Sequence, residues 1–116
     1  MTRRAAERRG RAAESLAAWW LRLHGWRILD RRVRTRVGEV DLIARRGGII
    51  AFVEVKARTT GAALDLAIDR HRLSRVAAAA NAVAARYASG GEDIRIDVIL
   101  LAPWRCPRHI VNAWHG

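Results

Sequence analysis

The chain has 116 residues, the usual size of one domain, and 51% of them are hydrophobic, which excludes a wholly disordered chain. A single cysteine excludes an internal disulfide and a multi-cysteine zinc site and favours a reducing, cytoplasmic setting, and no apolar run reaches the ~18 residues of a membrane span. The net charge of +11, carried by 21 arginines and one lysine, favours a nucleic-acid partner over a merely solubilising surface produced by coding bias towards arginine.

The first part of the chain predicts a helix and a strand. Residues 1–4 are expected to form a loose basic arm, and residues 5–24 to form a helix with one apolar face. The face is built from side chains at positions i, i+3, i+4 and i+7, namely Leu16, Trp19, Trp20 and Leu23. Gly25 suits the end of this helix, and residues 26–33 are predicted to form a strand.

The centre of the chain predicts a β-hairpin, and the remainder predicts a helix with further strands. Gly47-Gly48 forms the two-residue turn of the hairpin, between a strand at 39–45 and a strand at 49–57 that is buried on both faces. The later elements are a loop at 59–61, a helix at 64–88, a strand at 94–101 and a short edge strand at 109–114. We therefore expect residues 1–116 to form one α/β domain, with an αβββαβ core whose central mixed sheet is flanked by helices.

The predicted hairpin brings acidic side chains together. Counting outward from the turn, Asp41 lies directly opposite Glu54, and Glu39 lies opposite Lys56. Two carboxylates whose Cβ atoms are ~4.5–5.5 Å apart repel each other, and the repulsion grows where water is partly excluded. A sequence shaped by stability alone would rarely place them so, and the pattern indicates a functional site.

A divalent cation would turn this repulsion into binding. Mg²⁺ or Mn²⁺ is held by one or two carboxylates together with other oxygen ligands, so Asp41, Glu54 and the backbone carbonyl of Val55 are candidate ligands. Lys56 would lie beside a coordinated water or a phosphate oxygen, where an ammonium can orient the water or stabilise developing charge. The structural alternative is an ordinary cross-strand ion pair of Glu39 with Lys56, with arginines holding the other acids.

Two stretches of the hairpin resemble a known nuclease motif. GEVDLIA at 38–44 and FVEVKAR at 52–58 resemble the PD-(D/E)XK motif, in which an Asp on one strand precedes an acid-x-Lys on the next. The chain as a whole resembles the YraN-type family of small bacterial endonuclease-like proteins, which is similar to archaeal Holliday-junction resolvases. Supporting stretches are GRAAESLAAWW, HGWRIL, IDRHRLSRV and RIDVILL. The resemblance implies a restriction-endonuclease-like fold.

The resemblance also implies roles for individual residues. Asp41 and Glu54 match the metal-binding acids of the motif, and Lys56 matches its catalytic lysine. Two further acids match positions found in such proteins, Glu39 in the GEVD stretch at the start of the strand at 39–45 and Glu14 on the first helix. The first letter of the motif is absent here, because Val40 stands before Asp41.

Arginines near the hairpin are the candidates for contacts with phosphate groups. They are Arg31, Arg32, Arg34, Arg36, Arg72 and Arg75. Arg72 stands where the family usually carries a lysine on its second helix.

The sequence predicts a Mg²⁺- or Mn²⁺-dependent phosphodiesterase that acts on DNA, including branched or damaged DNA. The alternative is a non-catalytic nucleic-acid-binding module with the same fold. Cutting two strands needs two sites, which leaves a homodimer as an open expectation, and no membrane association is expected.

Overall fold

The computed structural model describes residues 3–58, 70–103 and 105–114, and their order of elements confirms the predicted αβββαβ core with a further short strand. In chain order the elements are α1 (Arg3–Leu23), β1 (Arg27–Arg34), β2 (Glu39–Arg46), β3 (Ile49–Ala57), α3 (Arg70–Tyr87), β4 (Asp93–Leu101) and β5 (Arg108–Ile110). The final strand is shorter than the predicted one at 109–114. The predicted loop at 59–61 and the start of the predicted helix, at 64–69, lie outside the described residues.

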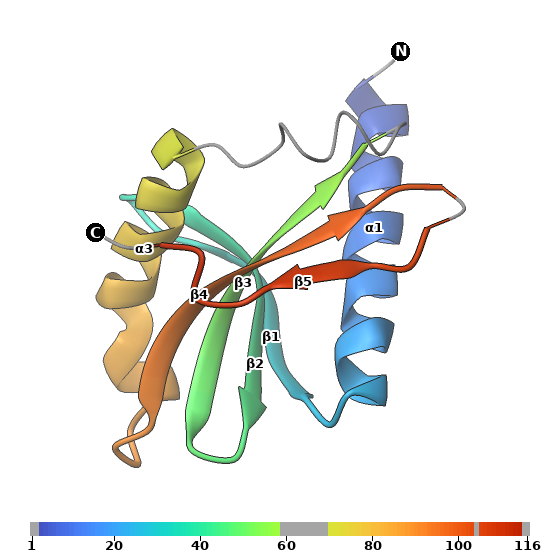
Figure 1. Ribbon diagram of the computed structural model, residues 1–116. Coiled ribbons are helices and arrows are strands. Elements are labelled where there is room, and N and C mark those ends of the chain that lie inside the picture. The colour runs from blue at the N-terminus through green and yellow to red at the C-terminus, as the bar shows by residue number, and fades with distance from the viewer. Residues whose placement is uncertain (1–2, 59–69, 104, 115–116) are drawn as a thin grey trace.

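The five strands form one mixed sheet in the order β1-β2-β3-β4-β5. Only the β3–β4 pair is parallel among these neighbours, and the other three pairs are antiparallel. A parallel pair needs a crossover connection, and the crossover here carries α3. Figure 1 shows α1 and α3 on opposite sides of the sheet, so each helix covers one face.

The sheet has a hydrophobic core on each face. On the α3 side, Phe52 packs with Leu73 and Val76 of the helix, and on the α1 side Val53 packs with Leu21. Ala51, Phe52 and Val53 are completely buried, although alternate side chains of β3 point to opposite faces. The prediction that the return strand of the hairpin is buried on both faces is therefore confirmed.

The prediction of the buried face of the first helix is wrong for Leu16, Trp19 and Leu23, whereas the fourth residue, Trp20, is partly buried and packs against the core. Leu16, Trp19 and Leu23 are 55%, 61% and 78% exposed, and the helix instead buries Ala17, Ala18 and Leu21 against the sheet. Small alanine side chains allow the helix backbone to approach the sheet closely. Both sides of α1 carry apolar residues, and the prediction chose the side with the larger side chains as the buried one, although most of that side faces solvent.

The ends of α1 also differ in part from the sequence prediction. Arg3 and Arg4 belong to the helix and not to a loose arm. At the other end, Gly25 has a φ of 86°, and the N–H groups of Gly25 and Trp26 donate to the carbonyls of Arg22 and Leu21. This is the hydrogen-bond pattern of a glycine-terminated helix, which confirms the predicted role of Gly25.

Gly38 fixes the start of β2 against α3. A Cβ atom at Gly38 would lie 2.0 Å from the carbonyl oxygen of Arg75, so a side chain here would push the helix away. The close approach places Glu39, the next residue, beside the helix face that carries Arg75.

None of the helices in the described part of the chain is long and apolar enough to cross a membrane.

Candidate active site

The centre of the candidate site is the point at which β2 and β3 separate. Their ladder has the predicted register but ends at the pair Leu42–Val53, so it does not include the predicted pairs Asp41–Glu54 and Glu39–Lys56. Beyond that pair the N–H of Val55 in β3 has a side-chain acceptor in place of a backbone carbonyl of β2. It donates a hydrogen bond of 2.7 Å to Oδ2 of Asp41. In an antiparallel ladder the N–H and C=O of one residue point to the same neighbouring strand. The carbonyl of Val55 therefore faces the same side as its N–H, towards Asp41.

Glu54 and Lys56 extend the site along β3. Their side chains share the face of the sheet covered by α3, and both residues are buried, at 3% and 7% exposed. The Nζ of Lys56 lies 3.3 Å from Oε1 of Glu54. Arg72 of α3 contacts the same oxygen, with Nε and Nη2 each at 3.1 Å. A buried carboxylate requires such partners, and Glu54 has two cationic ones.

The crowded surroundings raise the pKa of Asp41. Burial is the largest cause that raises its pKa, and the neighbouring charge of Glu54 adds to it. The hydrogen bond from Val55 lowers the pKa, Glu14 raises it and Arg72 lowers it again, with a net result of about 7. Near neutral pH this carboxyl group is therefore divided between its protonated and ionised forms. A proton or a bound cation would relieve the repulsion between the two acids.

Glu14 approaches the site from α1. Its side chain is 14% exposed and accepts a bond of 2.6 Å from Nε of Arg32. Arg32 has a φ of 52°, a backbone conformation that is uncommon for residues other than glycine. Glu14 is near enough for its charge to raise the pKa of Asp41. The structure thus places one predicted phosphate contact, Arg32, on one predicted acid, Glu14.

A cavity of about 190 Å³ with a charged lining opens beside Glu54 on the α3 side. It is lined by Glu39, Glu54, His71, Arg72, Arg75 and Val76. Glu39, Arg72 and Arg75 are exposed, so the cavity joins the buried carboxylate of Glu54 to a charged surface. Of the other predicted phosphate contacts, Arg31 and Arg34 are exposed on β1 and Arg36 is exposed in the turn before β2. The structure thus gathers Glu39, Arg72 and Arg75 at Glu54.

The donors at this site suit a hard divalent cation in type but are few in number. Among the described residues no group of three or more His, Cys, Asp or Glu side chains is arranged to hold a metal ion. The candidate set is smaller: the carboxylates of Asp41 and Glu54 with the carbonyl of Val55. Mg²⁺ commonly uses one or two carboxylates and completes its octahedron with water and substrate phosphate, so this set fits.

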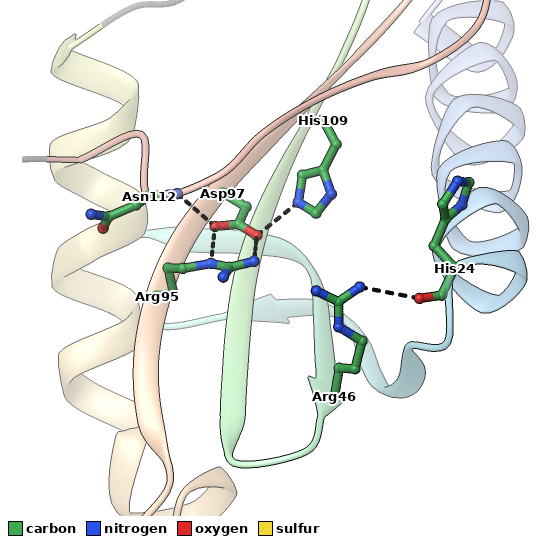
Figure 2. A network of polar contacts seen from close by, with 6 residues as sticks. All are labelled: His24, Arg46, Arg95, Asp97, His109 and Asn112. Carbon is green, nitrogen blue, oxygen red and sulfur yellow. Dashed lines mark hydrogen bonds and ion pairs between the residues drawn. The ribbon is translucent and has the colours of Figure 1, made fainter.

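A second buried acid, Asp97, was missed by the sequence analysis. Asp97 is fully buried in β4 and accepts two hydrogen bonds of 2.9 Å from Arg95, one of 2.7 Å from the ring of His109, and one of 2.9 Å from the N–H of Asn112. Figure 2 shows these groups converging on the carboxylate, and nearby Arg46 donates to the carbonyl of His24. The signal was present in the sequence, because an Asp within an apolar strand follows an Arg by two residues and so shares its face.

Comparison with known proteins places this α/β domain in a family. A profile described as "Uncharacterised protein family UPF0102" matches residues 13–101, which include Asp41, Glu54, Lys56 and Arg72. A UPF0102 protein of Rhizorhabdus wittichii is 64% identical over 114 residues, 98% of this chain and 97% of the relative. One of Sphingopyxis alaskensis is 66% identical over 114 residues, 98% of both chains. One of Methylorubrum extorquens is 50% identical over 113 residues, 97% of this chain and 88% of the relative. The chain belongs to the UPF0102 family.

Proposed function

We propose that this chain is a metal-dependent phosphodiesterase of the PD-(D/E)XK type, similar to the YraN-type endonuclease-like proteins, and that it acts on DNA. One observation carries the proposal: Asp41 and Glu54 crowd together where β2 and β3 separate, with Lys56 on Glu54 and the pKa of Asp41 raised to about 7. Strongly shifted carboxyl groups that lie beside a specific charge partner concentrate at functional sites. An ordinary ion pair would not leave Asp41 in this state.

The residues of the site would divide the work as follows. Asp41, Glu54 and the carbonyl of Val55 would hold Mg²⁺ or Mn²⁺, which supplies Lewis acidity and positive charge for phosphoryl transfer. Water attacks the phosphorus in line, a P–O bond to the sugar breaks, and the leaving oxygen takes up a proton. Lys56, held against Glu54 at 3.3 Å, would present its ammonium to the attacking water or to the negative charge on the phosphate.

The surface supports a polyanionic substrate. The net charge is +11, and exposed arginines lie on β1, in the turn after it and on α3. Phosphate contacts of this type fix position and register but carry no sequence information. We therefore propose that the protein recognises DNA structure, such as a branch, a nick or damage, more than base sequence.

Hydrolysis assays on several DNA structures test the proposal. Branched, nicked and single-stranded DNA would be incubated with Mn²⁺ or Mg²⁺ and wild-type protein, with chelator and the Lys56→Ala variant as controls. We expect cleavage that requires the cation and falls at least ~100-fold in Lys56→Ala. Cleavage that persists in chelator, or that Lys56→Ala leaves unchanged, would contradict the proposal.

The second candidate function is a nucleic-acid-binding module without turnover. It is favoured by the two cationic partners that Glu54 already has, Lys56 and Arg72, and by the small ligand set. This function predicts DNA affinity that falls steeply with salt, survives Lys56→Ala and does not respond to Mn²⁺, without any cleaved product.

Sedimentation of the protein with and without DNA would show whether two copies assemble for the two strands.

A further inference from the structure

Three nitrogen atoms of Arg72 and Lys56 lie around Oε1 of Glu54. Nε and Nη2 of Arg72 lie at 3.1 Å and Nζ of Lys56 at 3.3 Å from this single oxygen. The contact from Nε of Arg72 is a hydrogen bond and the other two are ion pairs, so positively charged groups occupy the space around this oxygen. A cation that binds Glu54 through Oε1 has to take the place of at least one of these partners.

The two partners of Glu54 differ in their freedom to leave. The Lys56 side chain is 8% exposed and is held within the sheet face under α3. The Arg72 side chain is 55% exposed and lines the cavity beside Glu54. Withdrawing the Arg72 guanidinium into solvent or onto another anion therefore costs little, whereas removing Lys56 would leave a buried ammonium without its partner.

The guanidinium of Arg72 also suits a second acceptor. Its planar donors bind phosphate in a two-point geometry, which a lysine ammonium cannot reproduce. The cavity it lines is shared with Arg75 and Glu39, so an incoming phosphate would meet two guanidinium groups and one carboxylate beside Glu54. Arg75 is the matched comparison, because it lines the same cavity and no contact with Glu54 is recorded for it.

We propose that Arg72 is a switching ligand: it neutralises Glu54 until a divalent cation takes that carboxylate, and it then binds a phosphate of the DNA. The inference rests on the proposed function and adds a coupling to it. A cation that releases Arg72 prepares the cavity for phosphate, and a phosphate that captures Arg72 exposes Glu54 to the cation. By linkage each ligand must then raise the affinity of the other by the same factor.

Titration with Mn²⁺ alone gives the first test. Removing the competitor in Arg72→Gln should tighten Mn²⁺ binding about tenfold, the effect of roughly 1.4 kcal/mol. Arg75→Gln removes an equal charge from the same cavity and should tighten binding only slightly, through the general loss of repulsion. Equal effects in the two variants would overturn the inference, because the cation would then use Oε2 of Glu54 and leave Arg72 in place.

Coupling between Mn²⁺ and DNA gives the second test. A phosphorothioate-linked DNA duplex, which resists hydrolysis, should tighten Mn²⁺ binding to the wild-type protein. Arg75→Gln should bind the duplex more weakly but keep most of this coupling, whereas Arg72→Gln should lose most of it. Coupling that is as strong in Arg72→Gln as in Arg75→Gln would overturn the inference.

Failure of the inference and failure of the proposed function give different results. If the wild-type protein binds Mn²⁺ and cleaves DNA while both variants behave alike, only the switching role of Arg72 is lost. If no Mn²⁺ binds to wild type or to either variant, the metal site and the switch fail together. Arg72→Lys, which keeps the charge without the planar donors, serves if Arg72→Gln is poorly folded, and should show Mn²⁺ affinity between wild type and Arg72→Gln.

Discussion

Asp41 and Asp97 are two aspartates within strands of one sheet, and their surroundings shift the pKa in opposite directions. Burial raises the pKa of Asp97, but hydrogen bonds from His109, Arg95 and the backbone of Asn112 outweigh it, and the pKa lies below its usual value. Asp41 is half-buried and receives one recorded hydrogen bond, from Val55, while burial and Glu54 raise its pKa to about 7.

The difference separates a structural carboxylate, Asp97, from Asp41, which we propose to be functional. Asp97 is ionised, fully paired and tied to β5, so its charge helps to hold the C-terminal segment to the sheet. Asp41 lies beside a second acid in a region where water is partly excluded, so its charge opposes folding. Unfavourable charge of this type persists in proteins where a ligand will use it.

Asp97→Asn should have the largest effect on stability. The amide would keep the shape of Asp97 but leave Arg95 without its anion and turn N–H groups towards donors, so we expect a loss of about 3–5 kcal/mol. Because the pKa of Asp97 is lowered in the folded protein, its ionised form stabilises the protein above the unfolded-state pKa, and this stability is lost as the pH falls through the folded-state pKa. Urea unfolding at several pH values measures both effects. Asp93→Asn, exposed at the start of the same strand, is the control, and equal losses in the two variants would remove the structural role of Asp97.

The same substitution at Asp41 should have the opposite sign. A raised pKa means that the neutral form favours the folded state: that stability is complete below the unfolded value of 3.8 and is lost as the pH rises through about 7. Asp41→Asn stays neutral and can still accept from Val55, so at pH 8 in chelator it should be more stable than wild type by roughly 2–3 kcal/mol. The difference should shrink towards pH 4. A destabilised Asp41→Asn at pH 8 would make Asp41 a structural residue like Asp97.

Mn²⁺ should stabilise the wild-type protein and should do so more at pH 8 than at pH 6. A proton on Asp41 competes with the cation, so raising the pH through about 7 frees the ligand. At ten times Kd the gain would be about 1.4 kcal/mol, seen as a rise in Tm. Asp41→Asn should show little response at either pH. A shift of equal size in both proteins would mean that the cation binds elsewhere.

The sequence was informative about this site wherever one local rule decided the outcome. The Gly47-Gly48 turn set the hairpin register as far as the pair Leu42–Val53, and the next residues, Asp41 and Glu54, lie near enough for the charge of Glu54 to raise the pKa of Asp41. The alternation of β3 likewise placed Glu54 and Lys56 on one face, where their side chains are paired. These are short-range consequences of a two-residue turn and a period of two.

Features that depend on tertiary packing could not be predicted in the same way. Either side of α1 is apolar enough to be buried, and only the fit of Ala17 and Ala18 against the sheet decides that Trp19 is exposed. Arg72 and Glu54, which are in contact, are 18 residues apart in the chain, and His109 and Asp97, which are also in contact, are 12 residues apart on two different strands. Partners such as these depend on how elements meet, for which charge spacing along the chain gives no rule.

Glu14→Gln should have the smallest effect on stability. It tests whether one neighbouring acid or two raise the pKa of Asp41. Among the causes that raise the pKa of Asp41, burial and Glu54 precede Glu14, so removing the Glu14 charge should lower that pKa only partly. The lost pair with half-exposed Arg32 should cost less than ~1 kcal/mol of stability. Carboxyl-carbon NMR titration of Asp41 measures the pKa, and Mn²⁺ titration of the same variant accompanies it. A return of the Asp41 pKa to its usual value would mean that Glu14, and not Glu54, is the acid that acts on Asp41. A collapse of Mn²⁺ affinity would make Glu14 a ligand, and the site would then join α1 to the hairpin.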